Sequence, residues 1–203
     1  MPGNIRLYGT TGYIELAAPT TGTNTTLTLP TDSIQPGMVL IANQTITSAS
    51  SVSINNCFSS IYENYLLMMR FTAVSGAADT QVRMRVRASG TDDTGTNYSF
   101  QTLDVYNATV SAGVNTGQTG AKLTAFGSTY PPYQFAVAEI TGPNIAQPTM
   151  FITRSHILDN SGNKYFEANA GSHNLSSAYD GLTIFTASGQ TFSATLRIYG
   201  YRN

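Results

Sequence analysis

The chain has 203 residues and a formal net charge of −1 at neutral pH, and only 10% of its residues are charged. Soluble domains usually carry about 25% charged residues, so the surface of this protein is polar but largely uncharged. Nucleic-acid binding requires clustered Lys and Arg side chains that displace counterions from phosphates, so the charge balance excludes nucleic acid as an expected partner.

Cys57 is the only cysteine, so a single chain forms no disulfide and no thiolate metal site, and we expect this residue to be buried. Residues 1–9, MPGNIRLYG, lack the basic and apolar regions of a signal peptide. No stretch approaches the roughly 18 apolar residues of a membrane-spanning helix. These features predict a protein that is made in the cytoplasm and does not insert into a membrane.

Residues 12–31, GYIELAAPTTGTNTTLTLPT, are predicted to form a strand, a turn and a second strand. Few apolar side chains are available to this N-terminal region, and those we expect to be buried are Leu7, Ile14, Leu16, Leu27 and Leu29. Burying each of them stabilises by about 1.5–3 kcal/mol, whereas ordering about thirty residues costs about 1–2 kcal/mol per residue. The segment therefore must pack on the C-terminal domain, on other copies of the chain or on another protein.

Residues 30–37, PTDSIQPG, combine two prolines with Asp and Gly and mark a domain boundary. We predict an attachment or oligomerisation segment over residues 1–36 and a β-sandwich domain over residues 37–203. The best helical candidate is a single turn within residues 56–65, NCFSSIYENY. Elsewhere apolar and polar residues alternate with a period of two, which indicates an all-β protein.

Two strands stand out at the start of the predicted sandwich. Residues 64–74, NYLLMMRFTAV, carry apolar side chains on both faces and predict a central strand that is covered on both sides. Residues 81–89, QVRMRVRAS, alternate strictly. The side chains expected to face the core are Val82, Met84 and Val86. Those expected to face solvent or a neighbouring subunit are Arg83, Arg85 and Arg87.

Further strands are predicted along the rest of the chain, separated by turns rich in Gly, Pro, Asn and Asp. They cover residues 98–106, 135–140, 149–158, 164–170 and 181–187. Residues 191–203, TFSATLRIYGYRN, form a last alternating strand that is expected to close the domain. Eight or more strands without helical periodicity favour an antiparallel, jelly-roll-like β-sandwich.

Two groups of side chains are candidates for contacts with a ligand or partner. The row of Arg83, Arg85 and Arg87 could bind anionic lipopolysaccharide or a partner's carboxylates, although such a row more often forms a solvated ladder countered by nearby acids. Residues 128–135, STYPPYQF, hold Tyr130 and Tyr133 around two prolines. This rigid aromatic loop could stack on sugar rings, fill an interface pocket or pack on its own sheet.

Metal and catalytic motifs are weak. Asp92, Asp93 and Asn97 share a Gly-rich loop that could offer oxygen ligands to Ca²⁺, but the spacing departs from an EF-hand and a plain turn is favoured. His156 and His173 fit no metal pattern. The acidic residues are scattered singly, and the sequence contains no G-x-S-x-G motif. We therefore expect no metal, no cofactor and no enzymatic activity.

The N-terminal pattern of Gly, alternating aliphatic residues, Ala-Ala-Pro and TGTNTTLTLPT resembles a segment of bacteriophage tail fibres and related virion proteins, where it commonly joins an attachment region to a distal domain. Three further stretches resemble β-sandwich modules of virion proteins from marine phages, including those of cyanobacteria. They are INNCFSSIYENYLLMMRF, VRMRVRASGTDDTGTNYSFQ and LRIYGYRN. The resemblance implies a phage structural protein, located in the virion and trimeric.

We therefore expect a non-enzymatic tail or head fibre whose sandwich faces the host surface, where a glycan is a candidate ligand, and whose N-terminal segment binds other virion proteins. The alternatives are a capsid decoration protein and a glycan-cleaving enzyme built on a jelly roll. We further expect a homotrimer in which residues 4–30 of each chain pack on other chains. Three copies would give the aliphatic side chains of this segment a shared core and would close its strand edges.

Overall fold

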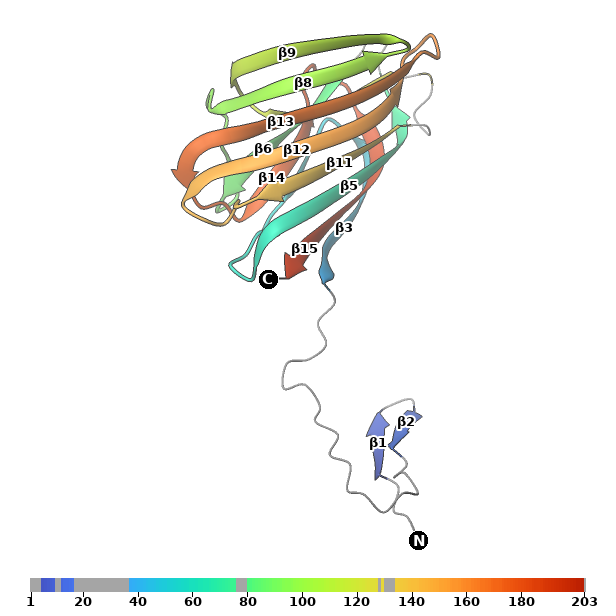
Figure 1. Cartoon of the computed structure of the whole chain (residues 1–203), viewed down its shortest axis with the longest axis vertical. Coiled ribbons are helices and arrows are strands. Elements are labelled where there is room, and N and C mark those ends of the chain that lie inside the picture. Colours follow the sequence, from blue (N-terminus) through green and yellow to red (C-terminus); the bar gives the residue numbers. More distant parts are fainter. Residues whose placement is uncertain are drawn as a thin grey trace. The chain divides into compact units, whose positions relative to one another are not determined.

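The structure is a computed structural model that describes residues 5–9, 12–16, 37–75, 80–127, 129 and 134–202 (Figure 1). The chain divides into two units, Met1–Gln35 and Pro36–Asn203. In the first unit, β1 (Ile5–Gly9) and β2 (Gly12–Leu16) pair in antiparallel fashion, with Leu7 opposite Ile14 in the register. The strand predicted around Leu27 and Leu29 lies outside the described residues.

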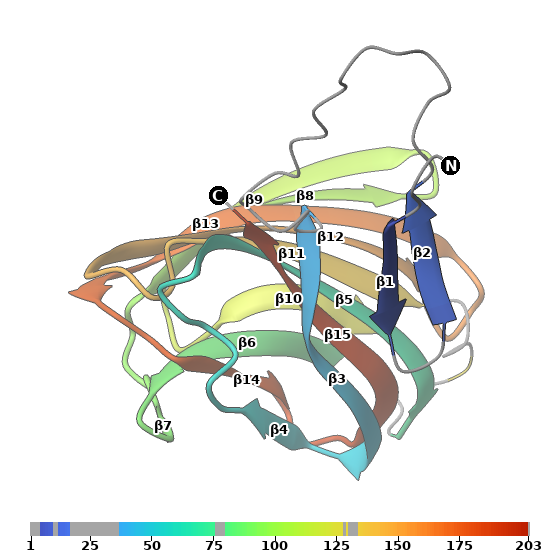
Figure 2. The same ribbon diagram turned by 90° about the horizontal axis from the view of Figure 1, so that it is seen from below.

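The second unit consists of two antiparallel sheets, which Figure 2 shows as separate layers. The larger sheet has eight strands, in the order β3 (Met38–Ala49), β15 (Phe192–Arg202), β5 (Tyr62–Val74), β11 (Phe135–Thr141), β12 (Gln147–Leu158), β13 (Lys164–Ser177), β8 (Tyr98–Tyr106) and β9 (Thr109–Gln118). The smaller sheet has the order β10 (Ala121–Phe126), β6 (Thr80–Ala88), β14 (Gly181–Thr186) and β4 (Ser51–Ile54), with β7 (Thr91–Asp92) beside β6.

Eight of these strands have the order of a jelly roll, because β3-β15-β5-β11 in one sheet is matched by β4-β14-β6-β10 in the other. The chain crosses between the sheets as it passes from β3 to β4, β5 and β6. The remaining long strands form two hairpins, β8–β9 and β12–β13, and both hairpins extend the larger sheet beyond β11. The predicted all-β, antiparallel, jelly-roll-like sandwich is thus confirmed.

The core lies between the sheets and takes alternate residues from each strand. Val82, Met84 and Val86 of β6 are all buried, which confirms the predicted register of this strand. Around Phe71 of β5, the rings of Phe126 and Phe192 pack at centroid distances of 5.7 and 6.0 Å. Aromatic side chains from three strands and both sheets therefore join the two layers.

Residues 56–74 confirm one expectation and correct two others. Cys57 is buried as predicted, and burial raises the pKa of its thiol to about 12. However, no helical turn occurs in this stretch, and β5 begins at Tyr62. β5 is central, between β15 and β11, but only one of its faces is covered by described residues, and Met68 on the other face is 44% exposed. No helix in the described part of the chain is long and apolar enough to cross a membrane.

Candidate functional site

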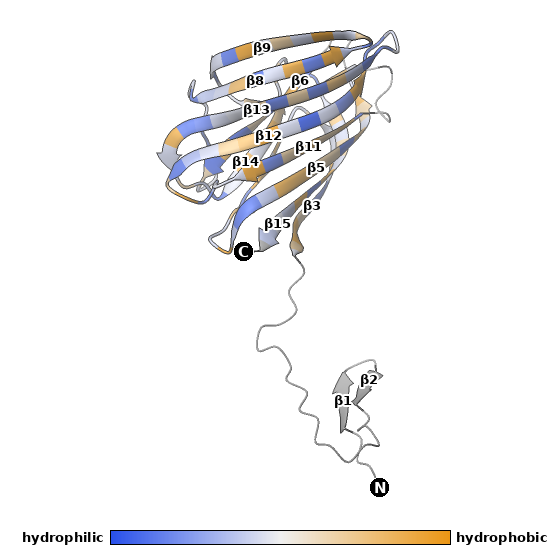
Figure 3. Ribbon diagram, viewed as in Figure 1, coloured by the Kyte–Doolittle hydropathy of each residue, from blue (hydrophilic) through white to orange (hydrophobic). Residues whose placement is uncertain are grey.

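The face of the larger sheet that points away from the core is here called the outer face. Its positions alternate with the buried residues, and many of them carry apolar side chains that are 44–71% exposed. These are Leu40, Met68, Leu103, Val114, Phe135, Met150, Ile152 and Phe166. Figure 3 shows polar and apolar residues alternating along the strands of this sheet. Exposed apolar side chains gathered on one face of a sheet are typical of a binding surface.

Part of the outer face is hollowed where the two added hairpins lie side by side. The groove has a volume of about 590 Å³, and small residues such as Ala168, Ala170 and Ala112 line it. Larger apolar side chains, Leu103 and Ile152 among them, also line it. The groove thus lies on β8, β9, β12 and β13, the strands that are additional to the jelly roll.

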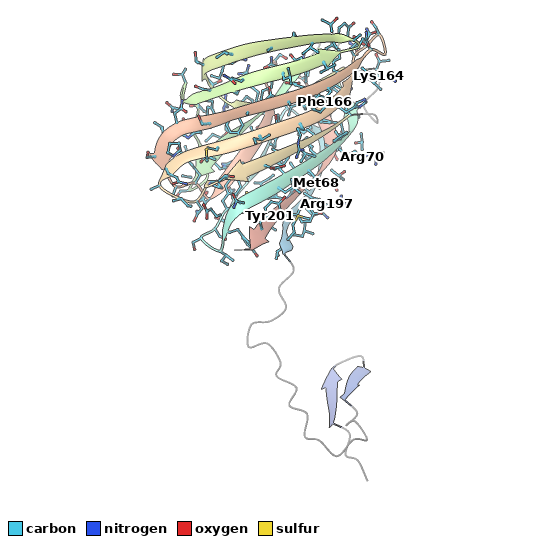
Figure 4. The ribbon with its side chains drawn as sticks, in the orientation of Figure 1. Met68, Arg70, Lys164, Phe166, Arg197 and Tyr201 are labelled. Carbon is cyan, nitrogen blue, oxygen red and sulfur yellow. The ribbon has the colours of Figure 1, made fainter. Side chains whose placement is uncertain are left out.

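The charged side chains on the outer face are mostly basic. Among the described residues, its charged positions are Arg70, Arg154, Lys164, Arg197 and Glu139. Only one of these cations is paired, since Arg154 Nη2 lies 2.5 Å from Glu139 Oε1. The guanidinium groups of Arg70 and Arg197 and the ammonium of Lys164 are exposed and form no hydrogen bond or ion pair within the described part of the chain (Figure 4).

Aromatic rings lie in one row across this face. Phe166 of β13 is opposite His156 of β12, His156 is opposite Phe135 of β11, and Phe135 is opposite Arg70 of β5. Residues that face each other across antiparallel strands share one side of the sheet. The rings of Phe135 and His156 are stacked, with centroids 6.3 Å apart. Phe166, His156 and Phe135 are here called the aromatic row, and Arg70 extends it.

The arginine row that the sequence singled out lies on the other sheet and is held by its own chain. Arg83 donates hydrogen bonds to the side chains of Gln81 and Gln118. Burial, together with the neighbouring charge of Arg85, lowers the pKa of Arg83.

Arg85 and Arg87 also bind groups of their own chain. Arg85 donates to the Thr119 carbonyl at 2.7 Å, and its guanidinium lies 3.8 Å from the centre of the Phe185 ring. Arg87 is only 7% exposed, so the expectation that it faces solvent or a neighbouring subunit was wrong. It lies 3.4 Å from Asp92 and donates to Thr183 at 2.8 Å.

The other predicted contact residues are placed only in part. Tyr130 and Tyr133, like Leu27 and Leu29, lie outside the described residues. The remaining three belong to the β1–β2 pair, and they are Leu7, Ile14 and Leu16. Their role in oligomerisation or attachment stays a prediction.

The carboxylates of Asp92, at the end of β7, and of Asp93, in the loop that follows, bind groups of their own chain. Asp92 accepts a hydrogen bond from Thr183 at 2.6 Å, and Asp93 lies 2.7 Å from Nε2 of His173. Asp93 also accepts from the backbone of Gly95 and from Asn97. Burial raises the pKa of Asp93, but the bonds from Gly95, His173 and Asn97 outweigh burial and lower it. No group of three or more His, Cys, Asp or Glu among the described residues could hold a metal ion.

The fold also brings together two acids that are far apart in the sequence. Asp104 of β8 lies opposite Glu167 of β13, beside a pocket of about 200 Å³. Glu167 is only 2% exposed, accepts from Asn169 at 3.1 Å and lies 2.5 Å from Nζ of Lys122. A carboxyl group buried and bonded in this way is poorly placed to reach a glycosidic bond. The sequence could not show this pairing, because it depends on the register of β8 and β13.

Comparisons of the chain with protein-family models, with curated proteins and with solved structures gave no match. The fold and the outer face define a class, a jelly-roll protein whose larger sheet is widened by two hairpins and exposes an apolar and basic surface.

Proposed function

We propose that the chain is a non-enzymatic structural protein of a phage particle, a tail or head fibre whose jelly roll faces the host surface. The observation that carries this proposal is the outer face of the larger sheet. It combines exposed apolar side chains, a groove and cations without partners in the described chain, all on one continuous sheet. A rigid sheet face with these properties suits adhesion to an extended surface.

The N-terminal unit supports an attachment role in the same protein. Residues 1–35 form a unit separate from the jelly roll, and their β1–β2 pair is a two-stranded sheet. An isolated two-stranded hairpin is marginally stable in water, so it gains stability from packing on another surface. A segment that attaches a protein to a virion would pack on another protein in this way. The sequence of the N-terminal unit also resembles phage fibre segments.

A non-catalytic role is supported by the state of the buried ionisable groups. Glu167 with Lys122 and Arg87 with Asp92 are ion pairs, and His173 shares a hydrogen bond with Asp93; each contact links different strands or loops. Groups that are engaged in such contacts are less available for proton transfer to a substrate.

Immunogold electron microscopy tests the proposal. Antibodies raised against the purified chain are applied to phage particles that carry its gene, and particles of an unrelated phage serve as the control. Label on tail or head fibres is the expected result. Label spread evenly over the shell would favour a capsid decoration protein instead, and particles without label would overturn both versions.

A further inference from the structure

We propose that the outer face of the larger sheet binds an acidic polysaccharide, with Arg70 and Arg197 as its anion contacts and the aromatic row as a platform for sugar rings. This inference deepens the proposed function and rests on it, since it names the class of molecule that a host-facing jelly roll would recognise.

The charge of the face is the first support. The chain as a whole has a net charge of −1, yet its outer face carries four cations and one acid at described positions. Glu139 neutralises Arg154 alone, which leaves a net excess of positive charge on β5, β15 and β13. Exposed guanidinium groups without protein partners are suited to bidentate contacts with carboxylates or sulfates.

The spacing of the cations suits a ligand with repeated charges. Arg70 lies opposite Thr195 of β15, and Arg197 is two residues further along that strand. Such diagonal neighbours are about 7–8 Å apart. Arg197, Met68, Val137 and Arg154 lie in one row across four strands, so Arg197 and Arg154 are separated by about 14 Å at the usual strand spacing. A chain of charged sugars could contact Arg70 and Arg197, which are unpaired within the described part of the chain, at once, while Arg154 stays paired with Glu139.

The uncharged part of the face matches the other surfaces of a sugar. Sugar rings present apolar C–H faces, which the exposed rings of Phe135 and Phe166 could cover. Their hydroxyl groups need hydrogen-bonding partners, and polar side chains occupy outward positions nearby. Among these are Gln101, which lines the groove, and Thr195, which lies opposite Arg70.

The same charges argue against two other occupants. If two copies of the chain packed outer face to outer face, they would bring cations against cations, which disfavours a symmetric dimer through this surface. Nucleic acid would match the sign of the charge, but its binding requires a stronger basic footprint than four cations in a chain of net charge −1. An acidic polysaccharide has a lower charge density than nucleic acid, and its ring faces and hydroxyl groups match the aromatic row and the polar side chains of the outer face.

Biolayer interferometry with the full chain tests the proposal at physiological salt. The probes are alginate for carboxylates, dextran sulfate for sulfates, neutral dextran as the uncharged control and a thymidine oligonucleotide as the nucleic-acid control. We expect binding to alginate, dextran sulfate or both, and none to dextran. The probe that binds more tightly identifies the preferred anion.

Paired variants locate the binding surface. R70Q/R197Q should weaken polysaccharide binding on the order of tenfold, whereas R83Q/R85Q removes the same charge from the other sheet and should leave binding within about twofold. F135S keeps the charge but removes a ring of the platform, and it should weaken binding about three- to tenfold. Circular dichroism and melting temperature verify that each variant is folded.

Several results would overturn the inference. These are no binding to either acidic polysaccharide, equal loss in the two arginine pairs, loss only in R83Q/R85Q, or tighter binding to the oligonucleotide. Full affinity in both the F135S variant and the R70Q/R197Q variant would also overturn it. Immunogold labelling of fibres could still succeed in each case, so failure of this inference is distinguishable from failure of the proposed function.

Discussion

Met84 occupies the middle of β6, where its side chain is 5% exposed and surrounded by residues of both sheets. Its neighbours Arg83 and Arg85 point to the opposite face and bind their own chain. The sequence predicted which side of β6 faces the core, because apolar and basic residues alternate strictly along the strand and only the apolar side suits the core. It could not predict the partners of the arginines, since Gln118, Thr119 and Phe185 come from other strands or loops.

Replacing Met84 with Asp should abolish soluble folding. The substitution buries a carboxylate without a partner, which costs several kcal/mol against a total stability of about 5–15 kcal/mol. The soluble yield and the urea unfolding curve of M84D measure this effect. T72D places the same charge at an exposed position of β5 and should fold normally. Cooperative unfolding of soluble M84D would show that β6 has a different register.

Asp93 should make the free energy of unfolding depend on pH. The pKa of Asp93 is lowered in the folded protein. The charged carboxylate therefore contributes fully to the free energy of unfolding above the unfolded pKa of about 3.9, and this contribution is lost as pH falls through the pKa of the folded state. D93N should therefore lose roughly 1–2 kcal/mol at pH 7. The difference between the two proteins should shrink as pH falls below about 4. Urea unfolding at pH 7 and at pH 3 measures it, and an unchanged difference would contradict the role of the charge.

At the scale of elements, the hairpins β8–β9 and β12–β13 distinguish this sheet from a plain jelly roll. The sequence predicted β8, β12 and β13 because inward residues alternate with outward ones. It missed β9 because both faces of that strand are exposed and its Gly, Asn and Thr residues are those of a turn. It also missed β3, β4 and β10, and it missed β1, which pairs with β2. The last strand, expected to close the domain, lies inside the sheet between β3 and β5.

The contact between β13 and β8 depends on a glycine. A Cβ atom on Gly171 would lie 2.2 Å from the Ser99 carbonyl oxygen and 2.6 Å from Cβ of Phe100, so the strands would have to separate. G171A should destabilise the protein by about 1–3 kcal/mol, whereas G113A in β9 meets nothing within 4 Å and should change stability by no more than about 0.5 kcal/mol. Denaturant unfolding compares them. Equal stability of the two variants would indicate a different pairing of β13 with β8.

At the scale of the whole molecule, the outer face shows why the fold is easier to predict from the sequence than the candidate binding surface. Exposed residues such as Phe135, Met150 and Phe166 have the same alternation as core residues, and only the structure shows that one set has no cover among the described residues. Arg70 and Arg197 are 127 residues apart in the chain, and they become diagonal neighbours through the pairing of β5 with β15.

The assembly of the protein is a prediction at this scale. The N-terminal segment has too few apolar side chains to fold alone, so we expect a trimer with a mass near three times 21.7 kDa in light scattering. Deleting residues 1–36 should weaken assembly and leave a folded β domain. A full-length monomer with a protease-resistant N-terminus would contradict this, because the segment would then pack on its own jelly roll.

Adhesion through the outer face is the central claim, and binding of fluorescently labelled protein to host cells tests it most directly. Flow cytometry should show saturable binding of the full chain, a loss of most of that binding in R70Q/R197Q and retention in R83Q/R85Q. Absence of saturable binding, or binding that survives in R70Q/R197Q and disappears in R83Q/R85Q, would contradict the claim.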